Sequence, residues 1–134
     1  MSDTPIRSWL RQYRTITMVG LSNNPTRDSY QVAEYLLAHG FTVHGVNPAI
    51  SEAHGHTVYP SLSETPAPVE FVNVFRRPDT LPALVDEILA LGTVKIVWLQ
   101  LGVTHIDSEA RLRAAGIEVI ADRCLKVEHR RLFG

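Results

Sequence analysis

The sequence contains a single cysteine, Cys124, and no long hydrophobic run. One cysteine excludes an intramolecular disulfide framework and is typical of the reducing cytosol, so we expect a cytoplasmic protein. No segment approaches the roughly 20 consecutive apolar residues that cross a bilayer. The N-terminal segment MSDTPIRSWL also lacks an apolar stretch behind a basic start. These absences predict that neither a membrane nor export is involved.

An excess of either charge is also missing, because 13 Lys and Arg residues face 14 Asp and Glu residues, for a net charge of −1. Without a stripe of basic residues, broad binding of nucleic acid is not expected, and any bound anion must be met by a few local groups. The 45% hydrophobic and 20% charged residues are typical of a globular protein. The length of 134 residues predicts one unit over residues 1–134.

Predicted strands and helices alternate along the chain. Apolar spacing predicts a short N-terminal helix with Thr4 as its N-cap, and further helices after Asp28, over residues 81–89 and after Thr104. Glutamine or aspartate three residues after Asp28 and Thr104 predicts a capping box at each helix. Five strands are expected, at residues 15–19, 41–46, 70–75, 94–99 and 117–121, with a polar loop at 49–57. This alternation predicts an α/β fold, a doubly wound and mostly parallel five-stranded sheet in a three-layer α/β/α arrangement.

Polar and glycine residues gather at the carboxyl ends of the predicted strands, where ligands bind in such sheets. Gly20 permits a tight turn after the first strand, and Ser22 and Asn23 precede a helix whose N-terminal N–H groups attract anions. Only the first glycine of the three-glycine dinucleotide fingerprint is present, so this turn alone is equally typical of an ordinary capped helix. A bound phosphate is therefore one of two interpretations of the turn.

The end of the second strand bears on which nucleotide would bind. NAD sites usually carry Asp or Glu there to hold the ribose hydroxyls, whereas this chain has Val46, Asn47 and Pro48. The absence of Asp or Glu at this position disfavours NAD and leaves NADP or another phosphorylated adenosine open as the ligand. Arg27 and one of Arg76 and Arg77 are candidates for an extra phosphate, while the other arginine is expected at a solvated corner. An NAD(P)-binding oxidoreductase or redox-sensing regulator stays an alternative.

Six segments, in this order and spacing, resemble the stand-alone CoA-binding domain proteins, a Rossmann-like family similar to the CoA-binding domain of the succinyl-CoA synthetase α subunit. They are GLSNNP at 20–25, VNP at 46–48, VYPSL at 58–62, FRR at 75–77, WLQLG at 98–102 and DRCLK at 122–126. The resemblance implies binding of coenzyme A or an acyl-CoA as the small-molecule partner. One departure is His105, where the family more often carries Asn.

Site residues carried over by motif fall into four groups. The resemblance implies that Gly20, Ser22 and Asn23 lie by the pyrophosphate, with Arg27 and Ser29 nearby. It implies that the adenosine is bordered by Val46, Asn47 and Pro48, and that the residues lying across the ligand are Phe75, Arg76 and Arg77. It also implies that Gln100 and Gly102 approach the pantetheine arm.

Catalytic and metal-binding groups are few. In the synthetase, chemistry needs a phosphorylated histidine from a further domain, so the resemblance implies only the part that holds CoA, and no catalytic residue is predicted. Cys124 with His129 could form a nucleophile and its base, but a lone cysteine is more often a small buried hydrophobe. His54 and His56 lack a third ligand, so no metal site is predicted. A homo-oligomer and a partner enzyme that supplies the catalytic groups both stay open.

Overall fold

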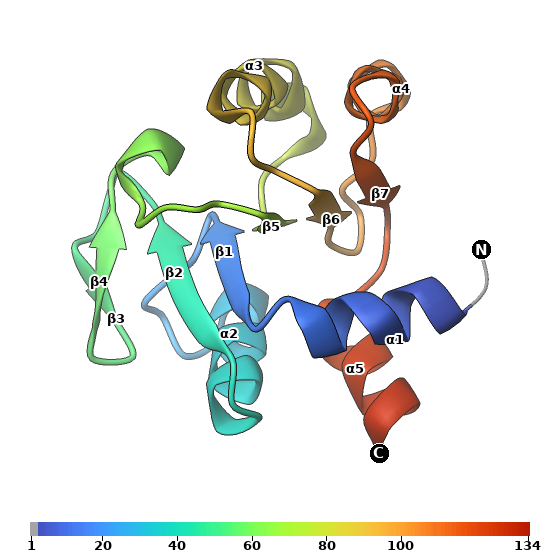
Figure 1. The fold of residues 1–134 in the computed structure, drawn as a ribbon. Coiled ribbons are helices and arrows are strands. Elements are labelled where there is room, and N and C mark those ends of the chain that lie inside the picture. Colours follow the sequence, from blue (N-terminus) through green and yellow to red (C-terminus); the bar gives the residue numbers. More distant parts are fainter. Residues whose placement is uncertain (1–2) are drawn as a thin grey trace.

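The computed structural model describes residues 3–134 and contains a seven-stranded sheet between two layers of helices (Figure 1). The helices are α1 (Asp3–Gln12), α2 (Asp28–Ala38), α3 (Leu81–Leu91), α4 (Ile106–Ala114) and α5 (Leu125–Phe133). The strands are β1 (Thr15–Val19), β2 (Thr42–Val46), β3 (Glu52–Ala53), β4 (His56–Tyr59), β5 (Phe71–Val74), β6 (Ile96–Leu99) and β7 (Glu118–Ile120). Single 3₁₀ turns occur at η1 (Leu62–Glu64) and η2 (Pro78–Thr80).

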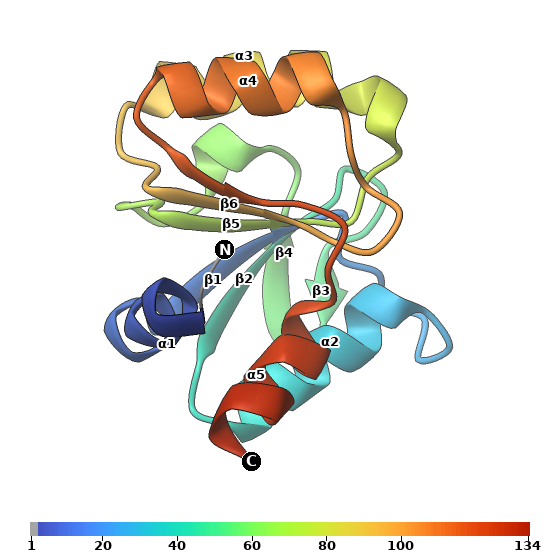
Figure 2. The same cartoon turned by 90° about the vertical axis from the view of Figure 1, so that its right-hand side faces the viewer.

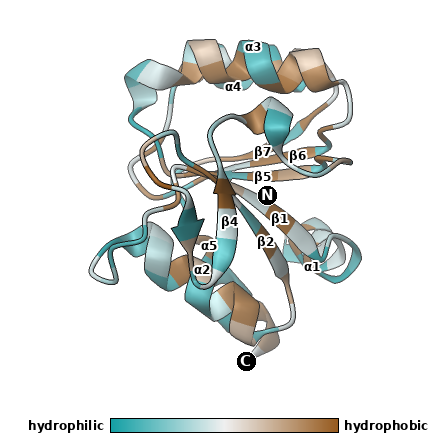
Figure 3. Ribbon diagram, turned by 90° about the vertical axis from the view of Figure 1, so that its left-hand side faces the viewer, coloured by the Kyte–Doolittle hydropathy of each residue, from teal (hydrophilic) through white to brown (hydrophobic). Residues whose placement is uncertain are grey.

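The sheet separates two hydrophobic cores. Helices α1, α2 and α5 cover one face, and α3 and α4 cover the other, as the side view shows (Figure 2). Side chains alternate along β1, so that Met18 packs with the first group of helices and Val19 packs with the second. Hydrophobic colour dominates β1, β5 and β6 between the two layers (Figure 3). Strands buried on both faces in this way are expected in a parallel sheet, and the predicted α/β class is confirmed.

Helix α3 illustrates how local sequence sets an element. Leu81, Leu84, Val85 and Ile88 are all buried against the sheet, as their helical spacing predicts. Burial of each such side chain contributes about 1.5–3 kcal/mol of transfer free energy. The helix ends at Gly92, whose φ of +69° is the left-handed conformation that glycine adopts readily.

The predicted number of five strands is wrong, because β3 and β4 form an antiparallel hairpin within and just after the segment predicted as a polar loop. His54 and Gly55 make its turn with positive φ values of 56° and 75°, as a two-residue hairpin turn requires. Strand β4 then pairs in parallel with β2 through Val58 and Tyr59. That long-range pairing, rather than any strong local pattern, stabilises the hairpin.

The predicted helix caps are also wrong. Helix α1 includes Asp3, so Thr4 is not its N-cap. The N-cap of α2 is Arg27, and the side chain of Gln31 donates to the Pro25 carbonyl at 3.2 Å. The N-cap of α4 is His105, whose Nδ1 accepts from the Ser108 N–H at 3.2 Å. Buried Glu109 accepts hydrogen bonds from the Thr104 hydroxyl and the His105 N–H, so the Thr104 hydroxyl bonds to a side chain and not to a backbone N–H of the first turn.

The strand order places one reversal of winding direction at the centre of the sheet. The order is β3-β4-β2-β1-β5-β6-β7, with every pair parallel except β3 and β4. From β1 the chain passes through α2 to β2 on one side, whereas from β5 it passes through α3 to β6 on the other (Figure 1). The carboxyl ends of β1 and β5 therefore flank the crevice where such sheets bind ligands. Among residues 3–134, no helix combines the length and the apolar character that crossing a membrane would need.

Candidate functional site

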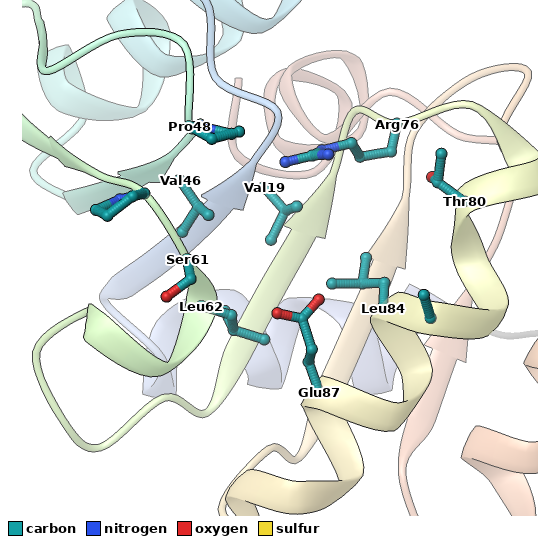
Figure 4. Close-up of a pocket in the computed structure, with 11 residues that line it drawn as sticks. Val19, Val46, Pro48, Ser61, Leu62, Arg76, Thr80, Leu84 and Glu87 are labelled. Carbon is teal, nitrogen blue, oxygen red and sulfur yellow. The ribbon is translucent and has the colours of Figure 1, made fainter.

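Three cavities lie along the carboxyl ends of the strands. The first cavity has a volume of about 400 Å³ and lies between the ends of β1 and β2, the segment at η1, and α3 (Figure 4). It is lined by Val19, Val46, Pro48, Pro60, Ser61, Leu62, Arg76, Thr80, Ala83, Leu84 and Glu87. The second cavity is lined by Gly20, Ser22, Arg27, Asp28, Ser29 and Phe75. The third is lined by Asp28, Phe75, Arg76, Arg77, Pro78, Gln100, Leu101, Gly102 and Val103.

Shared residues join these cavities into one track. Asp28 and Phe75 line both the second and the third cavity, and Arg76 lines both the first and the third. The segment that follows β5 thus lies at the centre of the track, next to the reversal of winding. Most residues that the sequence predicted for the site are brought together here.

The turn after β1 is held tightly between the ends of β2 and β5. Gly20 has a φ of +91°, and a Cβ at this position would overlap the carbonyl oxygen of Phe75. The Gly20 N–H donates to the Val46 carbonyl and the Phe75 N–H donates to the Val19 carbonyl, each at 2.8 Å. Only glycine meets both the positive φ and the close approach of the two backbones.

The second cavity opens at the N-terminus of α2. The Ser22 N–H donates to the Ser29 hydroxyl at 3.0 Å, and the Ser22 hydroxyl accepts from the Asn24 N–H at 3.0 Å. These bonds fix the turn beside the first residues of α2, where the N–H groups of a helix carry partial positive charge. The exposed side chains of Arg27 and Asp28 bring one charge of each sign to the rim.

The two neighbouring arginines after β5 have different surroundings. Arg76 is half-buried, and its guanidinium extends over the first cavity toward Pro48 and Val46 (Figure 4). Within residues 3–134 Arg76 forms no ion pair. The side chain of Arg77 is 82% exposed and forms an ion pair with Asp79 at 3.5 Å. One arginine is expected to face a ligand and the other a solvated corner. The difference in exposure makes Arg76 the candidate for the ligand and Arg77 the candidate for the corner.

The third cavity is supported by the segment at residues 122–126. The Gly102 N–H donates to the Asp122 carboxylate at 2.7 Å, and the Leu125 N–H approaches the side-chain oxygen of Gln100 at 3.4 Å. The indole N–H of Trp98 donates to the Arg123 carbonyl at 2.9 Å. These contacts connect the end of β6 to the start of α5, so this segment braces the carboxyl end of the sheet.

Comparison with known proteins identifies the family. Residues 14–130 match the model of the family described as CoA binding domain. The chain belongs to this family of CoA-binding domains. The resemblance drawn from the six sequence segments is thereby confirmed, and the chain carries a CoA-binding domain.

Relatives cover the CoA-binding domain over nearly all of its length. It is 36% identical over 128 residues to the uncharacterized protein YneT of Bacillus subtilis, which covers 96% of this chain and 94% of YneT. A solved structure from Thermus thermophilus has a TM-score of 0.95 and 41% identity, covering 99% of this chain and all of its own. An acetyl-coenzyme A synthetase 1 from Ca. Korarchaeum cryptofilum matches 84% of this chain with 27% of its own, at a TM-score of 0.72 and 22% identity, which shows a shared fold.

Two predicted residues of the CoA-binding domain line none of the three cavities. Asn23 is exposed in the turn before α2. Asn47 donates its side-chain amide to the Leu21 carbonyl at 3.0 Å, and its side-chain oxygen accepts from the Ala49 N–H at 2.9 Å. Asn47 thus joins the turns that follow β1 and β2.

The structure also adds residues that sequence reasoning missed. Thr80, Leu84 and Glu87 of η2 and α3 line the first cavity. The sequence predicts Leu84 only as a residue on the apolar face of a helix. No local pattern distinguishes Glu87 from other acidic residues on the solvent side of an amphipathic helix, so its position in the cavity needed the tertiary structure.

Proposed function

We propose that this protein binds coenzyme A or an acyl-CoA along the three cavities and acts as a binding module without catalytic residues of its own. The chemistry of the three cavities carries the proposal: the first is mostly apolar, the second lies at a helix N-terminus beside Arg27, and the third, which shares lining residues with both, includes Gln100 and Gly102. Coenzyme A has three parts of matching chemistry, namely a flat base, a set of phosphates and an uncharged pantetheine arm. Family membership supports the same ligand.

The adenosine would enter the first cavity. Aliphatic side chains and prolines make up most of its wall, among them Val46, Pro48 and Leu84. Such a wall suits a flat aromatic base, which gains free energy in proportion to the apolar area removed from water. Asn47 would support this end indirectly by holding the turn next to Pro48.

The pyrophosphate would lie at the second cavity. Gly20 lets the backbone approach closely, Ser22 and Ser29 provide small polar groups, and the N-terminus of α2 favours an anion. Arg27 and Asn23 are exposed beside this turn and would reach the phosphates from solvent. Arg76, between the first and third cavities, would form charge-assisted hydrogen bonds with a phosphate.

The pantetheine arm would cross Phe75 and follow the third cavity past Gln100 and Gly102. Apart from Asp28 and the two arginines, the residues that line this cavity are uncharged, as suits an uncharged arm of amides. Leu101, which is 62% exposed, adds apolar surface at the same place. The thiol or acyl end of the ligand would emerge here.

Two histidines among the candidate reactive groups make contacts within the fold that suit a structural role. His129 has its Nδ1 at 2.7 Å from the Tyr35 hydroxyl, so this nitrogen is already engaged. His54 has its Nε2 at 3.0 Å from the Tyr30 carbonyl and stacks on the Tyr30 ring. Within residues 3–134, no group of three or more His, Cys, Asp or Glu side chains is arranged to hold a metal ion.

The proposal is tested by calorimetric titration of the protein with CoA, dephospho-CoA, acetyl-CoA, NAD and NADP at one salt concentration. We expect CoA and acetyl-CoA to bind more tightly than dephospho-CoA, because loss of the 3′-phosphate removes a charge that an arginine can meet. NAD should bind most weakly, since the end of β2 offers no carboxylate to the ribose hydroxyls. A clear preference for NADP over CoA would refute the proposal and favour a redox-linked function.

Turnover is examined separately by incubating the protein with acetyl-CoA and following free thiol. We expect no release of CoA above the uncatalysed rate. Release that depends on the protein and saturates with acetyl-CoA would contradict the proposal of a binding module.

A further inference from the structure

The first cavity is lined by one acidic side chain, Glu87 of α3, among the residues described. Among the described residues that line it, Glu87 is acidic, Arg76 is basic, and the others are uncharged. The carboxylate of Glu87 extends from α3 into the cavity, above Leu62 and beside Leu84 (Figure 4). Within residues 3–134, no hydrogen bond or ion pair engages this carboxylate. Glu87 is exposed at the mouth of the cavity, so a bound ligand can contact its carboxylate.

The other polar groups of the cavity do not supply hydrogen-bond donors. The Ser61 hydroxyl donates to the Glu64 carboxylate at 2.8 Å, and the Thr80 hydroxyl donates to the Arg77 carbonyl at 2.6 Å. Each hydroxyl has one proton, so both can only accept from a ligand. Apart from Arg76, the side chains of this cavity thus present acceptors to whatever enters it.

Charge decides which end of a nucleotide faces these acceptors. A phosphate beside Glu87 would place two anions together in an apolar cavity, which is unfavourable. The phosphates are therefore favoured on the side of Arg76, and an uncharged hydrogen-bond donor on an apolar body is the favoured group beside Glu87. The exocyclic 6-amino group of adenine has this chemistry.

Resting on the proposed function, we infer that Glu87 is a specificity residue that accepts a hydrogen bond from the 6-amino group of adenine and so selects a 6-amino purine over a 6-keto purine. With a keto group at the same place, a carbonyl oxygen would face a carboxylate with no proton between them. The hydrogen bond of the amino group is then lost and two oxygen atoms repel each other, which disfavours the analogue.

The test compares CoA with its hypoxanthine analogue, in which oxygen replaces the 6-amino group, by calorimetry on the wild-type protein and on Glu87→Gln. We expect the wild-type protein to bind CoA about 3–10 times more tightly than the analogue, as for the net free energy of one hydrogen bond at an exposed carboxylate. In Glu87→Gln the ratio should fall to about one, because a side-chain amide can accept from an amino group or donate to a keto group.

Glu34→Gln is the matched control, since it removes the same charge from an exposed position on α2, on the opposite face of the sheet. Its ratio of affinities should equal that of the wild-type protein. A wild-type ratio near one, or a ratio that Glu87→Gln leaves unchanged, would overturn the inference while CoA still binds. Failure of the wild-type protein to bind CoA at all would instead overturn the proposed function.

Discussion

Replacing Arg76 and Arg77 separately with glutamine tests how the segment after β5 holds a phosphate. Arg76 is half-buried between the first and third cavities, with no ion pair within residues 3–134, whereas Arg77 is 82% exposed at its side chain and pairs with Asp79. A hydrogen bond between charged groups contributes about 1.5–3 kcal/mol. Arg76→Gln should therefore weaken CoA binding about 10- to 150-fold.

Arg77→Gln should weaken binding by about threefold or less, because an exposed pair contributes only ~0–1 kcal/mol and its charge is screened by salt. Both affinities are measured by isothermal titration calorimetry at two salt concentrations. Circular dichroism and urea unfolding should show that both variants keep the wild-type fold and stability.

The same titrations with dephospho-CoA identify the phosphate that Arg76 meets. If it pairs with the 3′-phosphate, removing the arginine and removing the phosphate should not be additive, and Arg76→Gln should lose little further affinity for dephospho-CoA. If it meets the pyrophosphate, the two losses should add. Equal effects of the two arginine substitutions, or a larger effect of Arg77→Gln, would refute the placement of Arg76 in the site.

Three further predictions concern the turn, the helix terminus and the pH dependence of stability. Gly20→Ala should lower the free energy of urea unfolding by about 1–3 kcal/mol more than Gly92→Ala does. Both glycines have positive φ, but a Cβ at residue 20 would overlap the Phe75 carbonyl whereas a Cβ at residue 92 meets open space. Equal losses of stability would contradict this reason. Asp28→Asn should tighten CoA binding up to about fivefold by removing an anion beside the proposed phosphate site, as calorimetry would show, and weaker binding would argue for a different phosphate position. Burial lowers the pKa of His129 and His44, so below a pH of about 6.5 the unfolded state binds more protons than the folded state. The stability that depends on these two groups should therefore be full above that pH and fall as the pH drops below it. Urea unfolding at several pH values should show a shallower fall in His129→Gln, whereas an unchanged slope would exclude His129 as a source.

The sequence by itself determined the features that rest on local physics. The spacing of Leu81, Leu84 and Ile88 determines α3, and the alternation of strands with helices determines the α/β class. Because ligands bind at the carboxyl ends of parallel strands, that order also located the candidate site at the turns after Val19 and Phe75. The six motifs, in their order and spacing, then identified the family.

Only the tertiary structure decided the features that depend on partners distant in the sequence. The β3–β4 hairpin is stabilised by pairing with β2, and α5 by burial of Leu125, Leu132 and His129 against other elements, although its own sequence is mostly polar. Arg76 and Arg77 are identical in type and adjacent, yet Arg76 is half-buried between two cavities whereas the side chain of Arg77 is mostly exposed at the edge of one. Glu87 enters the site because α3 packs beside the end of β1. Long-range packing selects among positions that local propensity treats as equivalent, because the free energy of a side chain depends on what surrounds it in space.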